Sequence, residues 1–275
     1  MNFEIGSRHH LYFPTIDQDT PFFFGFNKDA NGKPIIGSGA YDDRTYIFPT
    51  TLKLLRMNCD TSNQNHSALF HVDATYKLSI SRHPLLLFGR SNFKKEIKPI
   101  VLGIISQEET LEFKIFFSSI HSLCQHFGIN FVLRYMMQDA QASSSAAVRA
   151  VFGPDVTVLM CYFHLNQNVK KHLDKSVKHL KDIVLGDISC LHYCTDLTQY
   201  LNKRHEIISK WETFLELKQF KTYFVSQWIE SQWLNWQLFS RPPGFSTTNN
   251  NVESINGQIK KFFAKYRRGS INECL

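Results

Sequence analysis

Apolar and polar residues alternate over positions 68–78, so that Phe70 and Val72 fall on one face of an extended chain and Asp73 falls on the other. Alternation with a period of two predicts a half-buried β-strand. Two further apolar runs have the length of strands, and they predict a second strand at residues 84–90 and a third at 98–106. The three strands are expected to pair in antiparallel directions.

After residue 106 the apolar spacing lengthens to that of a helix, which is predicted to stop at Gly128. A fourth strand over 129–138 then carries Asp139 at its end. An Ala-rich helix follows, and it ends at Gly153-Pro154 because proline cannot continue a helix. The pattern closes with a fifth strand over 156–163 and one basic helix over 164–186.

Three strands, a helix, a strand, a helix and a strand form an order typical of a ribonuclease H-like α/β domain. Strand–helix–strand units close as right-handed crossovers, so the later strands add in parallel beside the first. The first and fourth strands are then neighbours, and Asp73 and Asp139 are expected to converge at one edge of the sheet. We therefore expect a mixed sheet of three antiparallel and two parallel strands, with an all-α insertion before the last helix.

The same pattern divides the chain into four segments. Residues 1–65 form a β-rich N-terminal segment of undefined role, and residues 66–186 form the ribonuclease H-like core. Residues 187–243 form the all-α insertion, and its four tryptophans are expected to build its core rather than a surface for stacking bases. Residues 244–275 form a C-terminal helix that returns to the core.

Composition supports a folded protein with a polyanionic partner. A hydrophobic content of 43% with 24 Phe excludes a wholly disordered chain, and the formal net charge is +7. The positive charge gathers in segments 164–181 and 241–275, which suits DNA phosphates. No signal peptide or membrane-spanning run is recognisable and the six cysteines are scattered, so we expect an intracellular protein with reduced thiols. The expected DNA-binding residues are Lys170, Lys171, Lys260, Lys261, Arg267 and Arg268.

Three acidic residues have contexts that indicate chemistry. Asp73 and Asp139 lie on or at the end of apolar runs, where an unpaired charge is costly. Glu253 lies on a basic amphipathic helix, in one stripe with Asn256 and Lys260. Two aspartates on strands and a helical glutamate are a common oxygen ligand set for a pair of Mg²⁺ or Mn²⁺ ions that act on phosphodiesters.

Simpler interpretations of the acids remain open. Each aspartate could cap a turn or a helix at a strand end, and Glu253 could be a solvated residue favoured by the helix dipole. Glu108 and Glu109, which follow the third strand, are the rival candidates for the third carboxylate. Such a pair is also common in the first turn of a helix.

Cys161 and His164 have the Cys-x₂-His spacing of half a zinc site, and the Cys and His residues of 190–194 could supply the rest. The 25 residues between His164 and Cys190 are predicted to form one long helix, so a structural zinc ion is not expected. We interpret Cys161 as a buried thiol and His164 as a polar residue near the acids.

Four stretches together resemble the transposase domain of Mutator-like elements: FHVDATYKL, MQDA followed by an Ala-rich helix and VFG, LMCYFHLNQNVKK, and STTNNNVESINGQIKK. The similarity covers residues 66–266. That family belongs to the DDE transposases, which have a ribonuclease H-like core. The resemblance implies that Asp73, Asp139 and Glu253 form the catalytic, metal-binding triad, with Cys161, His164 and Asn256 in support.

The resemblance also implies a function: metal-dependent DNA strand cleavage and strand transfer with two Mg²⁺ or Mn²⁺ ions as cofactors. The expected partner is double-stranded DNA (transposon ends and target) rather than a membrane, the location is the nucleus, and a homo-oligomer is left open. Two alternatives remain. One is a domesticated, catalytically inactive DNA-binding or regulatory protein, and the other is a zinc-dependent interaction module built on Cys161, His164 and residues 190–194.

Overall fold

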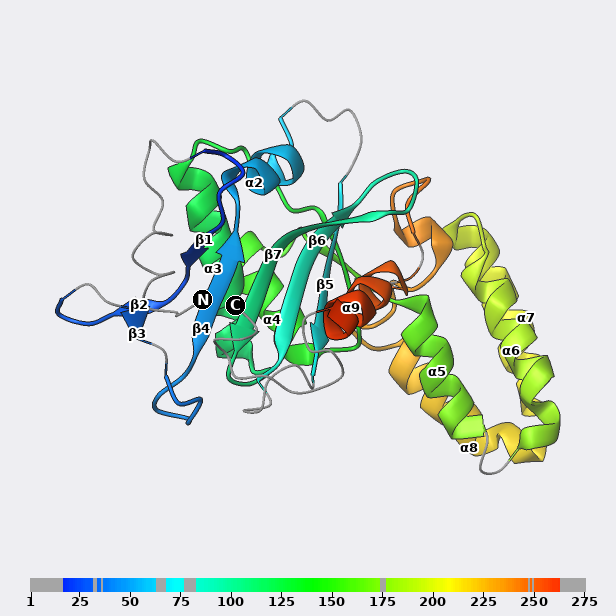
Figure 1. The fold of residues 1–275 in the computed structure, drawn as a ribbon. Helices are drawn as coiled ribbons and strands as arrows, with labels where there is room; N and C mark the ends of the chain where they lie inside the picture. Colours follow the sequence, from blue (N-terminus) through cyan, green and yellow to red (C-terminus); the bar gives the residue numbers. More distant parts are fainter. Residues whose placement is uncertain are drawn as a thin grey trace.

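The computed structural model describes residues 17–31, 34–35, 37–62, 68–76, 83–173, 177–246, 248 and 250–262. A twisted sheet with helices on both faces forms one part of the molecule, and a lobe of helices beside one sheet edge forms the other (Figure 1). No helix in these residues combines the length and the apolar character needed to cross a membrane.

The sheet is mixed and has seven strands in the order β1-β4-β7-β6-β5-β8-β9. Neighbours from β4 to β5 pair in antiparallel directions, whereas β5, β8 and β9 run parallel to one another. The predicted strand directions and the predicted contact between the first and fourth strands are therefore confirmed. The strands are β1 (Phe22–Phe24), β4 (Tyr46–Thr50), β5 (Leu69–Thr75), β6 (Leu85–Ser91), β7 (Ile97–Ile105), β8 (Tyr135–Gln138) and β9 (Thr157–Met160).

The N-terminal segment contributes to this same sheet. β1 pairs with β4, and β4 pairs with β7, so both strands extend the edge opposite β9. A small separate ribbon joins β2 (Asn27–Lys28) to β3 (Pro34–Ile35). The short helix α2 (Leu52–Cys59) begins at Thr51, whose side chain accepts a hydrogen bond from the Leu54 amide and so caps the helix.

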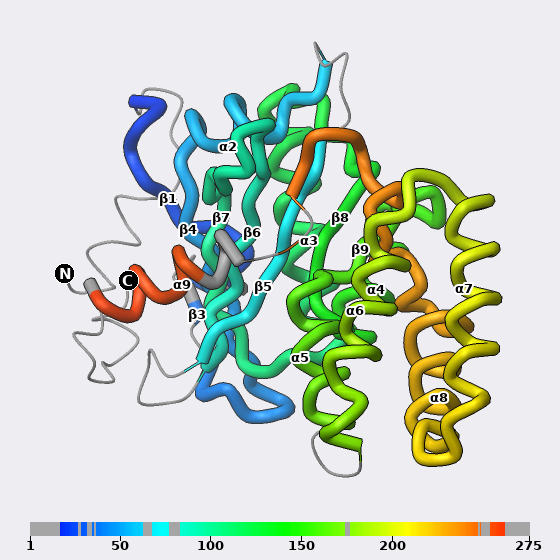
Figure 2. The backbone as a smooth tube through the Cα atoms, turned by 90° about the vertical axis from the view of Figure 1, so that its right-hand side faces the viewer, coloured from blue at the N-terminus to red at the C-terminus, as the bar shows by residue number. Residues whose placement is uncertain are grey.

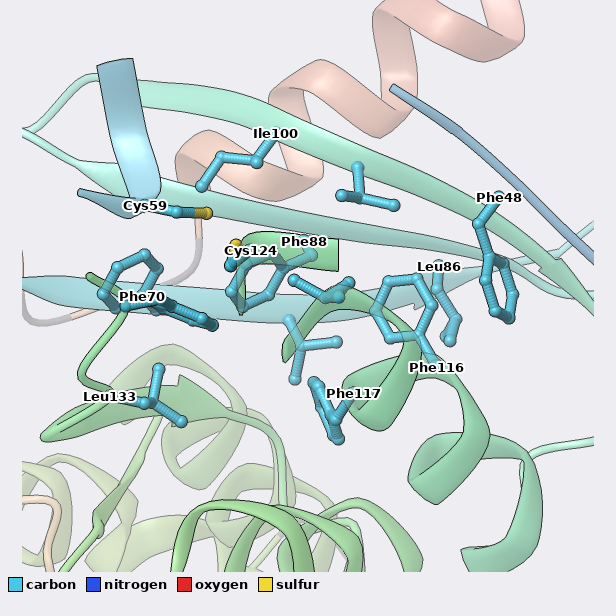
Figure 3. Close-up of a cluster of buried hydrophobic side chains, with 14 of the residues drawn as sticks. Phe48, Cys59, Phe70, Leu86, Phe88, Ile100, Phe116, Phe117, Cys124 and Leu133 are labelled. Carbon is cyan, nitrogen blue, oxygen red and sulfur yellow. The ribbon is translucent and has the colours of Figure 1, made fainter. Parts of the chain in front are cut away.

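Aromatic side chains fill the space between the sheet and the helices α3 (Thr110–His126) and α4 (Ala142–Phe152). Phe70 stacks on Phe88 with ring centroids 5.5 Å apart, and Phe116 meets both Phe48 and Phe88 edge-on (Figure 3). Burying an aromatic side chain of this size stabilises a fold by about 1.5–3 kcal/mol. This cluster fixes the position of β5 from the sheet face that α3 and α4 cover.

The two cysteines of this core lie against each other. Cys59 on α2 and Cys124 on α3 are both fully buried (Figure 3). The hydrogen bond between their thiols and their burial raise the pKa of Cys59 well above its ordinary value. Both sulfurs therefore act as small apolar groups in the core.

The helical lobe has a second hydrophobic core. It is built by α5 (Tyr162–Leu173), α6 (Lys181–His192), α7 (Leu197–Glu212), α8 (Lys218–Phe224) and the π-helix Val225–Ile229. The four tryptophans belong to this core, and the most accessible of them, Trp233, is only 7% exposed. The prediction that they form a core is confirmed. The boundary expected at residue 187 falls inside α6, and the division into domains stays a prediction.

One predicted helix is wrong. The single helix expected over 164–186 is two helices, because α5 ends at Leu173 and α6 begins at Lys181 after a 3₁₀ turn. Val177, with φ −141° and ψ 41°, is not helical, yet it is fully buried like Leu173 before it. The apolar period thus continues through a turn that has no glycine or proline to mark it.

The last described helix, α9 (Asn250–Phe262), crosses the sheet face opposite α3 and α4 (Figures 1 and 2). Its Ile255 and Ile259 pack against Leu87 and Ile97, which point to that face. The chain reaches α9 from the helical lobe through residues 241–246. There Arg241, which is 4% exposed, donates hydrogen bonds to the carbonyl groups of Trp236, Gln237 and Ser246.

Candidate active site

Strand register brings the two aspartates together. β5 and β8 pair in parallel with Leu69 opposite Tyr135 and His71 opposite Met137, an offset of 66 residues. Asp73 and Asp139 are also 66 positions apart. The same offset, continued beyond the last pair, sets Asp139 level with Asp73. Neighbouring strands of a sheet are about 4.8 Å apart.

A buried polar network holds the end of β8 where Asp139 leaves the sheet. The side chain of Gln138 is 2% exposed and accepts a hydrogen bond from Ser144 Oγ at 2.8 Å. Its amide donates to Ser145 Oγ at 2.7 Å, so both oxygen and nitrogen are satisfied by the first turn of α4. The Gln141 amide donates to the Asp139 carbonyl at 2.7 Å. These bonds fix the turn between β8 and α4 and with it the backbone of Asp139.

Asp73 and Asp139 line one pocket of about 200 Å³. A third carboxylate, Glu108, lines it as well, and the rest of the wall is neutral. The two aspartates expected to meet at the sheet edge thus face a common space. The other lining residues are Val72, Ala74, Tyr76, Phe113, Gln138, Gln141 and Ser144.

A side chain from α9 reaches the first aspartate. Asn256 Nδ2 donates to Asp73 Oδ2 at 2.7 Å, and Asn256 is 4% exposed. Asn256 was expected to support the triad, and this contact places it against Asp73. Glu253 lies on α9 three residues before Asn256, one helical turn away, and the structure describes its backbone position only.

Asp139 has a cationic neighbour in His164. The two side chains form an ion pair through His164 Nδ1 and Asp139 Oδ1. Burial alone would lower the pKa of His164, but the hydrogen bonds to Asp139 and to Cys161 outweigh it and raise the pKa to about 10. His164 is therefore protonated at neutral pH. Cys161 is fully buried, as expected, and its amide donates to the Gln138 carbonyl at 3.0 Å.

The ligand atoms of Cys161 and His164 are not gathered with those of Cys190, His192 and Cys194. His192 is buried, bonds through Nδ1 to the Trp236 carbonyl and stacks on Tyr162. Within the described part of the chain, the three metal-binding side chains whose ligand atoms all lie within 4.8 Å of one another are Asp139, Cys161 and His164. The second half of the zinc site considered from the sequence is not assembled here.

Four of the six expected DNA-binding residues fall on two helices. Lys170 and Lys171 lie near the end of α5, and Lys260 and Lys261 near the end of α9; Lys171 and Lys261 are exposed. Arg267 and Arg268 lie outside the described residues. Arg241, counted in the basic C-terminal segment, is buried in the linker and does not reach the surface.

The pocket wall also includes Glu108, one of the two rival carboxylates, and Tyr76, which was not predicted from the sequence. Both line the pocket, and burial together with the neighbouring Glu108 carboxylate, to which the phenol is hydrogen-bonded, raises the pKa of Tyr76. Glu109, the adjacent candidate, instead accepts a hydrogen bond from Arg44 at 3.0 Å. The available signal was that Tyr76 directly follows the strand that carries Asp73.

Removal of the Asn256 side chain should loosen α9. Asn256→Ala is expected to lower the free energy of unfolding by about 1.5–3 kcal/mol, because a hydrogen bond to a charged group is lost. Amide hydrogen exchange in α9 should become faster. Gln258→Ala, at an exposed position of the same helix, is the matched control and should leave exchange unchanged. Equal protection of α9 in both variants would show that the Asn256–Asp73 hydrogen bond does not hold the helix.

The raised pKa of His164 makes part of the stability depend on pH. A group whose pKa is raised on folding stabilises the protein fully below its unfolded value of 6.5 and loses this contribution as pH rises through about 10. In denaturation experiments without divalent cations, the wild type should therefore lose more stability between pH 6.5 and 10 than His164→Gln. Identical pH profiles would show that the ion pair does not form in solution.

Comparison with protein families gives one match, over residues 69–168, to the model described as MULE transposase domain. A search of curated proteins finds no match. The matched span contains Asp73, Asp139, Cys161 and His164, whereas Glu253 and Asn256 lie beyond it. It begins with β5 and ends in α5, so it covers the elements that build the pocket. The resemblance to a MULE transposase domain is therefore confirmed over residues 69–168.

Proposed function

We propose that this chain is the catalytic domain of a DDE transposase, which cleaves DNA strands and transfers them with divalent cations as cofactors. The observation that carries the proposal is the register of β5 and β8, which sets Asp73 level with Asp139 beside one pocket inside the MULE match. The strand order and directions support a ribonuclease H-like interpretation of the sheet.

The residues around the pocket fit hard divalent cations. Mg²⁺ and Mn²⁺ prefer carboxylate oxygens, and three carboxylates line this pocket. Glu108 Oε1 is buried without a hydrogen-bond partner among the described residues, which is costly for a carboxylate unless a cation lies near it. When bound, a pair of such ions activates the attacking oxygen and stabilises the leaving oxygen of a phosphodiester.

In this proposal Asp73 and Asp139 are the central ligands, and Glu253 completes the triad from α9. Asn256 holds Asp73 Oδ2 and so fixes the orientation of that carboxylate. Glu253 shares the helix with Asn256, so the bond that docks Asn256 also sets how near the backbone of Glu253 lies to the pocket. Lys260 is a further supporting group, one helical turn beyond Asn256.

His164 positions the second aspartate. Its imidazolium holds Asp139 Oδ1 and balances the charge of that carboxylate before any cation binds. With a divalent cation bound, Asp139 would have to share its carboxylate between that cation and His164. The fully buried Cys161 is hydrogen-bonded to the His164 side chain.

The DNA partner follows from the same proposal. Lys170 and Lys171 on α5 with Lys260 and Lys261 on α9 would contact phosphates, which supply affinity without reading sequence. Action on chromosomal DNA would place the protein in the nucleus.

Loss of the carboxylates should abolish cleavage. Asp73→Asn, Asp139→Asn and Glu253→Gln are each expected to lower nicking of a supercoiled plasmid in Mg²⁺ or Mn²⁺ by at least about 100-fold. Even residues that only position a metal ligand typically contribute about 10- to 100-fold. Asp155→Asn, an exposed aspartate after α4, is the control and should nick like the wild type.

Cleavage retained by Asp73→Asn or Asp139→Asn would refute the assignment of that residue. A wild-type chain that binds DNA without divalent cations, binds it equally well after all three changes and never nicks would favour the DNA-binding regulator instead.

Phosphate contacts should appear in the salt dependence of DNA binding. Lys171→Ala and Lys261→Ala should each weaken binding to duplexes of unrelated sequence alike and reduce the slope of log K against log salt by about 1. Lys53→Ala on α2, whose lysine pairs with Asp19 at 2.9 Å, is the control. An unchanged slope for the α5 and α9 variants would exclude those surfaces from the DNA path.

A further inference from the structure

Three glutamates stand at the start of α3, and their surroundings differ. Arg44 donates to Glu109 Oε2 at 3.0 Å and forms an ion pair with the buried Glu112. The guanidinium of Arg44 is itself largely buried, with 9% of the side chain exposed. Glu109 and Glu112 therefore have a structural cation, and their charges serve to join α3 to the segment before β4.

Glu108 is held differently. It lies just before the helix, in the turn after β7, and lines the pocket that also contains Asp73 and Asp139. No salt bridge to Glu108 is present among the described residues, and its Oε1 is buried without a hydrogen-bond partner there. Its neighbour at the pocket wall is the phenol of Tyr76, a neutral donor.

The turn that carries Glu108 is tied to the turn that carries Asp139. The side-chain amide of Gln141 donates to the Glu108 carbonyl at 3.4 Å, and the backbone N–H of Gln141 donates to the Asp139 carbonyl at 2.7 Å. One residue thus spans the two turns. The backbone of Glu108 is held relative to Asp139 by bonds that leave the Glu108 carboxylate to the pocket.

Ionisation of a carboxylate in this position is unfavourable, and the described neighbours of Glu108 do not offset that free-energy cost. A buried carboxylate oxygen without a partner loses hydration, and the nearby carboxylates of Asp73 and Asp139 have the same charge. His164 is paired with Asp139. A divalent cation in the pocket would give Glu108 Oε1 a partner and would offset the repulsion.

We infer that Glu108 is a further acidic ligand of the divalent cations in this pocket, held in place by Tyr76; this rests on the proposed function. Among the described residues, Asp139 belongs to a group of ligand atoms gathered within 4.8 Å, together with Cys161 and His164, whereas Asp73 and Glu108 do not belong to it. The three carboxylates of Asp73, Asp139 and Glu108 line the same pocket and could together hold a pair of divalent cations. Glu108 therefore adds to the triad and does not replace Glu253.

The experiment measures Mn²⁺ binding to the full chain without DNA, by water-proton relaxation or calorimetry. Glu108→Gln, which keeps the shape of the side chain, should weaken Mn²⁺ binding by about 10-fold or more. Glu109→Gln is the matched control: the adjacent glutamate does not line the pocket, so its variant should bind Mn²⁺ like the wild type. Glu108→Asp, which keeps the charge, should recover part of the lost affinity.

The outcomes separate this inference from the proposed function. Wild-type affinity in Glu108→Gln, together with loss of binding in Asp73→Asn, would overturn the role of Glu108 and leave the metal-dependent function intact. Equal weakening in Glu108→Gln and Glu109→Gln would also overturn it, since the effect would then be a general change in surface charge. Absence of Mn²⁺ binding in the folded wild type would overturn the proposed function as well.

Discussion

The pairing of β5 along both of its edges is the constraint on which the rest of the site depends. β6 bonds to one edge along the whole strand, and β8 bonds to the other edge up to His71. A shift of β8 by one residue would exchange its two faces and carry Met136 and Met137, both fully buried, out of their separate cores. The hydrophobic core thus enforces the register that sets the two aspartates level.

Three carboxylates around one pocket are each stabilised in a different way. Asp73 receives a neutral amide from a helix on the far face of the sheet, and Asp139 receives a protonated imidazole. Glu108 has a phenol at the pocket wall. Of these three described partners, the imidazole of His164 is the cationic one. Lys171 and Lys261, the exposed lysines proposed to contact DNA, lie on α5 and α9 and do not line this pocket.

The periodicity of apolar residues predicted those strands and helix ends that depend on neighbouring residues in the sequence. Alternation at Phe70, Val72 and Asp73 revealed β5 and its faces, and Gly128 and Gly153 marked the ends of α3 and α4. The break between α5 and α6 could not be predicted, because the apolar stripe continues through it and both helices bury it in one core. The sequence also could not show that Glu109 is paired, because its partner Arg44 lies 65 residues away in the chain.

The bond between Asn256 and Asp73 joins residues that are 183 positions apart. At about 5–20 residues per second, the ribosome needs roughly 10–40 s to synthesise the chain between them. β5 to β9 and the helical lobe leave the ribosome during that interval, so the sheet can pair while its acidic pocket still lacks α9. The order of synthesis therefore lets the strands that carry the acidic pocket pair before Asn256 is available to bind Asp73.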